Sequence, residues 1–283
     1  MIIDIHTHTF PARVAESAIG KLSHASHTIP FSDGSAEGLL STMTAAGIDL
    51  SLILPVATSE RQVEHINDSA AALNEAYSGK GLFSFGCIHP NYENYRKELL
   101  RIKELGLKGV KIHPVYQGVD LDDPRYLRIF DRIAELGLIA VTHTGLDVGF
   151  PGVVRCSPQM ALHVVKEIGD FSFILAHMGG WKNWDEVPEL LGETHVYLDT
   201  SFSTGRMHPL SDGYWTEKDL DLLDRDGFMR LYRAFGPDRL LFGTDSPWSP
   251  QTESVSFIQE LPLGAKEKRK ILGENAALLL KLM

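Results

Sequence analysis

The chain has 283 residues, of which 43% are hydrophobic and 23% charged, and its formal net charge is −10. This composition is ordinary for a folded globular protein, and no stretch has the roughly 18 uninterrupted apolar residues of a membrane span. The negative charge disfavours nucleic acids and anionic membranes as partners, because both are bound by clustered Lys and Arg.

The amino terminus, MIIDIHTHTF, has no basic residue before its apolar run. We therefore expect no signal peptide, and we expect a cytoplasmic protein. The two cysteines, Cys87 and Cys156, are too few for a disulfide framework and lack the spacing of a metal site. Each is predicted to be a buried packing residue.

Short stretches rich in β-branched or aromatic residues alternate with stretches of helical period, which predicts an α/β fold with a parallel sheet. The predicted strands are 2–6, 50–55, 82–88, 109–113, 139–143, 173–177, 196–200 and 240–243. The predicted helices are 37–46, 64–77, 92–105, 126–136, 158–168, 184–191, 228–235 and 265–282. Eight strands in a chain of this length predict a single domain over 1–283 with a closed barrel of eight βα units.

Three longer segments depart from the alternation: 20–35, 145–157 and 201–219. Each follows the end of a predicted strand. In a barrel of this kind the loops after the strands build the active site. We expect these segments to supply a lid and the walls of a binding pocket.

The first predicted strand carries two histidines, His6 and His8, at its end. Alternate residues of a strand face the same side, so these two share a face with Asp4, while Ile3 and Ile5 face the other way. A single buried histidine would more often be a core residue bonded to the backbone. Two histidines spaced by two at a strand end favour a shared metal ion.

Three further polar residues follow apolar runs: His143 ends LIAVTH, His177 ends FILAH, and Asp245 comes after LLFG. A carboxylate at such a position needs solvent or a cation to offset its charge. The alternative for Asp245 is a helix N-cap, although Trp248, Ser249 and Pro250 would make a poor helix. A barrel gathers strand ends, so the sequence predicts that these residues meet His6 and His8 around a metal.

The stretches IDIHTH, GVKIHP, VTHTG, LAHMGG and FGTDSPW resemble, in this order, the motifs of the amidohydrolase superfamily. The resemblance is to the amidohydrolase-related branch that includes aminocarboxymuconate-semialdehyde decarboxylase, and it spans nearly the whole chain. It implies a distorted (β/α)8 TIM barrel with one divalent metal at the carboxyl ends of the strands.

The resemblance implies that His6, His8, His143 and Asp245 bind the metal. It also implies that His177 is the general acid/base, with Asp245 as a second group that takes a proton. Imidazole and carboxylate ligands favour Zn2+, with Mn2+ as the alternative. A bound metal lowers the pKa of its water to about 7, and a neighbouring histidine can move the proton.

Lys111 and His113 share a face of the fourth predicted strand, and two interpretations remain open. In binuclear members of the superfamily a lysine at this strand is carboxylated and bridges two ions, which would add a second metal here. Otherwise Lys111 stays charged and attracts an anionic group of the substrate, while His113 donates a hydrogen bond to the substrate or to a ligand. We favour one metal, since mononuclear members also carry KxHP.

Aromatic and Arg residues that follow strand ends are candidates for the pocket wall. These residues are Trp181, Arg155, Arg206, Tyr116 and Trp248. Asp199 is predicted to orient a ligand histidine, a role that carboxylates commonly have around metal ions.

Our first hypothesis is hydrolysis of an ester, lactone or amide of a small carboxylated molecule by a metal-activated water, with His177 and Asp245 moving protons. The alternative is nonoxidative decarboxylation at the same metal. A third hypothesis, a barrel that binds metal without catalysis, is disfavoured because all five predicted positions are filled. The predicted partner is a small-molecule substrate, and a homodimer is the usual assembly of such enzymes.

Overall fold

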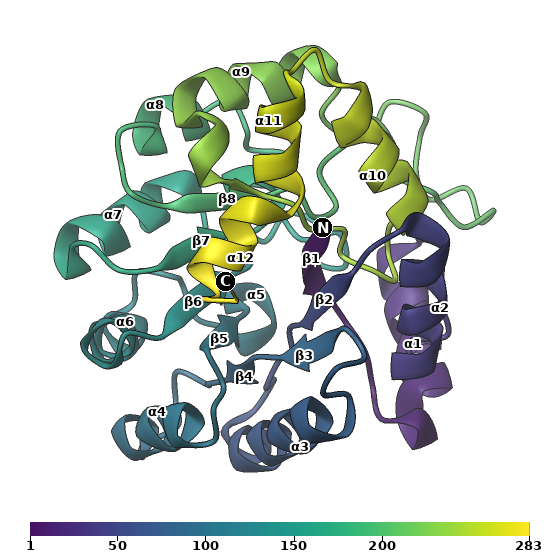
Figure 1. Ribbon diagram of the computed structural model, residues 1–283. Helices are drawn as coiled ribbons and strands as arrows, with labels where there is room; N and C mark the ends of the chain where they lie inside the picture. The colour runs from purple at the N-terminus through teal and green to yellow at the C-terminus, as the bar shows by residue number, and fades with distance from the viewer. Residues whose placement is uncertain (283) are drawn as a thin grey trace. The chain divides into compact units, whose positions relative to one another are not determined.

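The computed structural model describes residues 1–282, and the chain forms two compact units (Figure 1). The first unit comprises Met1–Ile53, Val148–Pro151 and the chain from Asp199 onward. The second comprises Leu54–Asp147 and Gly152–Leu198.

The strands of the first unit centre on β1 (Ile3–Thr7), which pairs in parallel with β2 (Leu50–Ile53). On its other side β1 lies along the chain that follows β9 (Leu240–Leu241). There Ile5 N donates to the carbonyl of Phe242 at 2.9 Å. This pairing continues beyond β9, and Ser246 lies opposite Thr7 at the end of β1.

Helices α1 (Ala12–Ser26), α2 (Ala36–Ala46), α9 (Arg225–Phe235), α10 (Gln251–Glu260), α11 (Ala265–Arg269) and α12 (Asn275–Leu279) belong to the same unit. Helix α2 begins at the Ser35 cap, whose side chain accepts from Gly38 N, and ends at Gly47 with left-handed backbone. Helix α10 packs against α2. A π-helical turn, Lys270–Glu274, joins α11 to α12.

The second unit is built on a parallel sheet. The strands of that sheet in this unit are β4 (Gly86–Cys87), β5 (Gly109–Ile112), β6 (Ile139–Thr142), β7 (Phe173–Leu175) and β8 (Tyr197–Asp199), whose last residue is assigned to the first unit. Strand β3 (Leu82–Ser84) also lies in the second unit but is not part of this sheet. Strands β4 to β8 pair in chain order, with Ile112 opposite Thr142 and Thr142 opposite Leu175. Strands β5, β6 and β7 are buried throughout, as in parallel sheets covered on both faces.

The helices of this unit are α3 (Val63–Ala76), α4 (Tyr95–Glu104), α5 (Pro114–Gln117), α6 (Pro124–Leu136), α7 (Pro158–Ile168) and α8 (Val187–Leu191). Helix α6 packs between α4 and α7, alongside β6 (Figure 1). The caps Asp123 and Ser157 each precede a proline at the first helical position, which explains why both helices begin there. Among the described residues, no helix is both long and apolar enough to cross a bilayer.

The predicted strands are all present, although most end one or two residues earlier than predicted. Three predicted segments differ in more than their ends. Segment 82–88 forms two strands separated by Phe85, and segment 20–35, predicted to be irregular, is helical as far as Ser26. The predicted helix 265–282 is interrupted by the π-helical turn, and helices α1, α5 and α10 were not predicted.

Candidate active site

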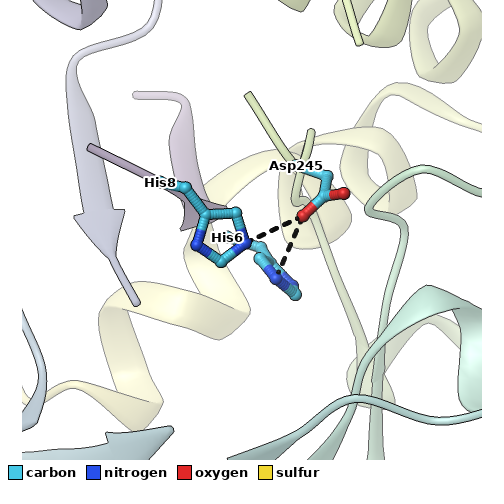
Figure 2. A group of neighbouring side chains, drawn as sticks. All are labelled: His6, His8 and Asp245. Atoms are coloured by element: carbon cyan, nitrogen blue, oxygen red, sulfur yellow. Dashed lines mark hydrogen bonds and ion pairs between the residues drawn. The ribbon is translucent and has the colours of Figure 1, made fainter. Parts of the chain in front are cut away.

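Figure 2 shows a group of three side chains in the first unit, His6, His8 and Asp245. His6 Nε2 lies 3.2 Å from Asp245 Oδ1, and His8 Nε2 lies 3.1 Å from the same oxygen. One ligand atom from each residue lies within 4.8 Å of the other two. These three predicted ligands therefore lie close together in the structure.

Local backbone geometry explains the convergence. His6 and His8 share a face of the chain at the end of β1, as the alternation predicts. Asp245 has a φ of 64°, and its N–H donates to the carbonyl of His6 at 2.8 Å. The alternative of an N-cap is wrong for Asp245, because α10 begins only at Gln251.

The protonation of His6 is set by Asp199 at the end of β8. His6 Nδ1 lies 2.8 Å from Asp199 Oδ2 and 2.9 Å from the hydroxyl of Ser201. Because a carboxylate only accepts, Nδ1 carries the proton and Nε2 presents a lone pair to Asp245. A lone pair facing a carboxylate oxygen calls for a cation between them, so this donor set fits a divalent metal. Asp199 therefore has the orienting position that the sequence predicts.

The second unit gathers the remaining predicted residues. His113 and His143 follow the neighbouring strands β5 and β6, and their rings stack at 4.3 Å between centroids. His177, which follows β7, places Nε2 2.9 Å from Nδ1 of His143. Lys111 lies on β5, two residues before His113, and its side chain is fully buried.

A chain of hydrogen bonds determines which ring nitrogens carry protons. His143 Nε2 lies 3.0 Å from the carbonyl of Leu146, which only accepts, so Nε2 is the donor and Nδ1 is the basic nitrogen. His177 Nε2 must then donate to it. Burial, with the charges of His113, His177 and Lys111, holds the pKa of His143 well below its usual value. His143 is therefore neutral at neutral pH, and Nδ1 is the atom that could bind a metal.

Asp147 belongs to this group, and the sequence reasoning missed it. Its Oδ2 lies 3.5 Å from His113 Nε2 and 3.8 Å from His143 Nε2. These three residues could in principle hold an ion, but His143 carries its proton on the nitrogen that faces Asp147. We interpret them as a hydrogen-bonded group. An acidic residue four positions after a strand-end histidine was the signal available in the sequence.

Turns with positive φ position these histidines. Gly145 has a φ of 91° and forms a parallel bridge with Trp181, where an added Cβ would collide with the Trp181 backbone nitrogen. His177 and Met178 both have positive φ, 58° and 54°. The indole N–H of Trp184 donates to the carbonyl of His177 at 2.9 Å and so holds this turn.

The predicted pocket residues fall into two groups. Tyr116 stacks on His113, and the backbone N–H of Trp248 donates to the carbonyl of Asp245, so both adjoin predicted site residues. Trp181 is buried and pairs with Gly145, which lies two residues after His143. The two arginines instead pair with carboxylates: Arg155 with Asp120 at 2.8 Å, and Arg206 with Glu217.

The two cysteines, Cys87 and Cys156, are buried and free, as predicted. Burial also raises the pKa of both thiols, so neither is a reactive thiolate.

The predicted site residues therefore form two groups. His6, His8 and Asp245 lie in the first unit, and His143, His177, Lys111 and His113 lie in the second. That all five predicted metal-site residues surround one cation remains a prediction, and so does the single domain.

Comparison with known proteins identifies the family and the fold of the chain. A family model described as amidohydrolase matches residues 3–282. The search of curated proteins finds no match. Among solved structures, an uncharacterised TIM-barrel protein from Bordetella bronchiseptica superposes with a TM-score of 0.75 at 19% identity, covering 99% of this chain and 98% of that one.

Two further solved structures are decarboxylases. The 5-carboxyvanillate decarboxylase of Sphingomonas paucimobilis has a TM-score of 0.70 at 17% identity over 99% of this chain and 98% of its own. A dihydroxybenzoic acid decarboxylase of a Polaromonas species, with bound manganese and the inhibitor 2-nitroresorcinol, has a TM-score of 0.69 at 16% identity over 99% and 97%.

These likenesses confirm the predicted TIM-barrel fold. They also correct our first hypothesis. Hydrolysis is contradicted, because the characterised structures that match are mostly decarboxylases, which favours the carboxy-lyase alternative. The preference for zinc is unsupported, since the Polaromonas structure and a further matching 5-carboxyvanillate decarboxylase structure both contain manganese. With a family match over almost its whole length, the chain belongs to the amidohydrolase family.

Proposed function

We propose that the protein is a metal-dependent nonoxidative decarboxylase of a small carboxylate. The observation that carries the proposal is the hydrogen bond from His177 Nε2 to His143 Nδ1, because it places a proton on a histidine at the carboxyl end of a strand. The likeness to decarboxylases of carboxylated and hydroxylated aromatic acids supports an aromatic substrate.

His6, His8 and Asp245 would hold the metal. His143 is kept as a predicted ligand through Nδ1, the nitrogen that its bond to Leu146 leaves basic. A metal bound there would displace the hydrogen bond from His177 Nε2 and would free that N–H for the substrate. A divalent cation supplies positive charge that stabilises the electrons left behind when a carboxylate departs. Two imidazoles and a carboxylate suit Mn2+ as well as Zn2+, so both ions belong in the test.

His177 is the proposed proton donor. In decarboxylation the bond between the substrate carbon and its carboxylate breaks, the electron pair stays on that carbon, and CO2 leaves. A proton must then form a new bond to the carbon. The imidazolium form of His177 would deliver it from Nε2, the atom that carries a proton in the structure.

Lys111 is the proposed site of attraction for the substrate carboxylate. Its charge lies in the interior and contributes to lowering the pKa of His143. A buried cation is costly unless an anion or hydrogen bonds offset it. A substrate carboxylate would supply that anion, and for this reason we favour the charged form of Lys111 over its carboxylation.

The test is CO2 release. Purified protein loaded with Mn2+ or Zn2+ would be incubated with a panel of hydroxybenzoates and carboxylated phenols, and CO2 would be measured by a coupled enzyme assay. Metal-stripped protein is the control. Release that depends on metal supports the proposal. Cleavage of an ester or lactone without CO2 from any carboxylate would overturn it.

A further inference from the structure

The carboxylate of Asp4 lies on β1, two residues before His6, and is completely buried. It accepts four hydrogen bonds. Oδ1 accepts from the backbone N–H of His6 at 3.2 Å and from that of Thr244 at 3.0 Å. Oδ2 accepts from the Thr244 hydroxyl at 2.6 Å and from the Gln251 side-chain amide at 2.8 Å.

These four donors come from three segments that are distant in sequence. The first is β1 itself, the second is the turn that carries Asp245, and the third is the start of α10. Thr244 also accepts, through Oγ1, from Ser246 N at 3.1 Å, so its side chain holds both sides of Asp245. One carboxylate therefore connects the strand of the two histidines to the turn of the aspartate.

Asp245 needs this support because its backbone is left-handed, with a φ of 64°. A non-glycine residue in this region is strained and persists only where its surroundings determine the conformation. The hydrogen bond from Asp245 N to the His6 carbonyl constrains the backbone of Asp245 directly. The two hydrogen bonds from Thr244 to Asp4 constrain the residue before it.

We propose that Asp4 is a positioning residue for the metal site. It holds His6 and Asp245 at the separation that a divalent cation requires. It does not contact substrate or metal; it acts through the backbone of His6 and through Thr244. The inference rests on the metal-binding part of the proposed function.

Asparagine should be able to replace Asp4. An amide oxygen at the Oδ1 position would still accept from the two backbone N–H groups. An amide nitrogen at the Oδ2 position would donate to the Thr244 hydroxyl and to Gln251 Oε1 after the glutamine amide turns over. Within residues 1–282, Gln251 Oε1 is buried without a hydrogen-bond partner, so it can accept this bond. Alanine would leave all four donors unsatisfied.

The experiment measures the Mn2+ dissociation constant of metal-stripped protein by calorimetric titration, below the melting temperature of each variant. We expect Asp4→Ala to weaken Mn2+ binding by about 10- to 100-fold, the range for residues that support metal ligands. We expect Asp4→Asn to stay within about threefold of the parent, because it keeps the hydrogen bonds but not the charge. Thr244→Val, which keeps its N–H and loses its hydroxyl, should lie between them and serves if Asp4→Ala does not fold.

Asn67→Ala is the matched control. Asn67 is a fully buried polar residue of the second unit, whose side chain bonds to the Cys87 backbone and to Glu98. Its loss should lower the melting temperature as Asp4→Ala does, without changing Mn2+ affinity. Equal Mn2+ affinity in Asp4→Ala and the parent would overturn the inference, as would equal weakening in Asp4→Asn and Asp4→Ala. No Mn2+ binding by the parent protein would instead refute the metal site of the proposed function.

Discussion

His177 donates a hydrogen bond from Nε2 to Nδ1 of His143, across 2.9 Å between the ends of two adjacent strands. The bond exists because the other nitrogen of His143 is committed to the carbonyl of Leu146. A proton donor and a basic nitrogen thus face each other in the second unit.

Replacing His177 by Asn should remove the proton donor and leave the fold intact. We expect kcat for CO2 release to fall by about 10²- to 10⁴-fold, the usual contribution of a general acid. Mn2+ affinity should change little. His163→Asn, at an exposed histidine paired with Asp122, is the control and should retain full activity. A His177→Asn enzyme with near-normal kcat would contradict the assignment.

Asp199→Asn should weaken metal binding by about 10- to 100-fold, because the amide no longer fixes the proton of His6 on Nδ1. The measurement is again Mn2+ affinity of metal-stripped protein. Asp170→Asn changes a similar carboxylate and histidine pair, in which His195 Nδ1 lies 2.8 Å away, at an exposed position. This control should leave Mn2+ affinity unchanged, and equal effects of the two substitutions would count against the prediction.

The stability of the metal-stripped protein should fall when the pH drops below about 6.5, the usual pKa of histidine. The pKa of His143 is well below that value in the folded protein, so at acidic pH the unfolded chain binds a proton that the folded chain does not. The contribution of His143 to the free energy of unfolding should therefore fall by up to about 1.4 kcal/mol for each unit that the pH drops below 6.5. Above pH 7 this contribution should be constant.

Urea unfolding between pH 5 and 8 would measure this dependence. His143→Gln cannot take up the proton, so its curve should be flatter than that of the parent below pH 6.5. Parallel curves for the two proteins would show that His143 is not the group responsible.

Lys111→Met should raise KM for the carboxylate substrate by about 10- to 100-fold, as expected for loss of a charge-assisted hydrogen bond. The methionine chain is apolar and suits the interior, so the melting temperature should not fall. Lys97→Met changes an exposed lysine and should leave KM as it is. An unchanged KM in Lys111→Met would exclude the proposed attraction.

Trp184→Phe should destabilise the turn of His177 by at least about 1 kcal/mol, the net value of one hydrogen bond, because it removes the indole N–H and replaces the buried indole with a smaller ring. We expect kcat to decrease with little change in KM, because the proton donor and not substrate binding is displaced. Steady-state kinetics and thermal melting measure the two effects. A change in KM alone would contradict this role.

The sequence predicted the strands and much of the site because both depend on short-range patterns. The spacing of His6 and His8 shows their common face, and the breaks after His143 and His177 show that each leaves a strand. The order of the family motifs added the TIM-barrel fold, which the comparisons confirm.

The residues that the sequence did not reveal act through long-range contacts. Asp147 is close to His113 only because β5 and β6 are paired in register, and Thr244 bonds to Asp4 across most of the chain length. The π-helical turn of Lys270–Glu274 is likewise set by packing, since Phe242 N donates to the carbonyl of Ile271. The choice of hydrolysis was wrong because both reactions use the same ligand types, and only the likeness to solved structures separated them.

The left-handed turn at Met178 has a consequence for directed evolution. Glycine there would relieve about 1 to 2 kcal/mol of backbone strain. However, the Met178 side chain is fully buried, and losing a buried chain of that size costs about 2 to 5 kcal/mol. Selection for heat resistance should therefore keep a bulky residue at this position, and the strained conformation beside the proton donor would be inherited with it.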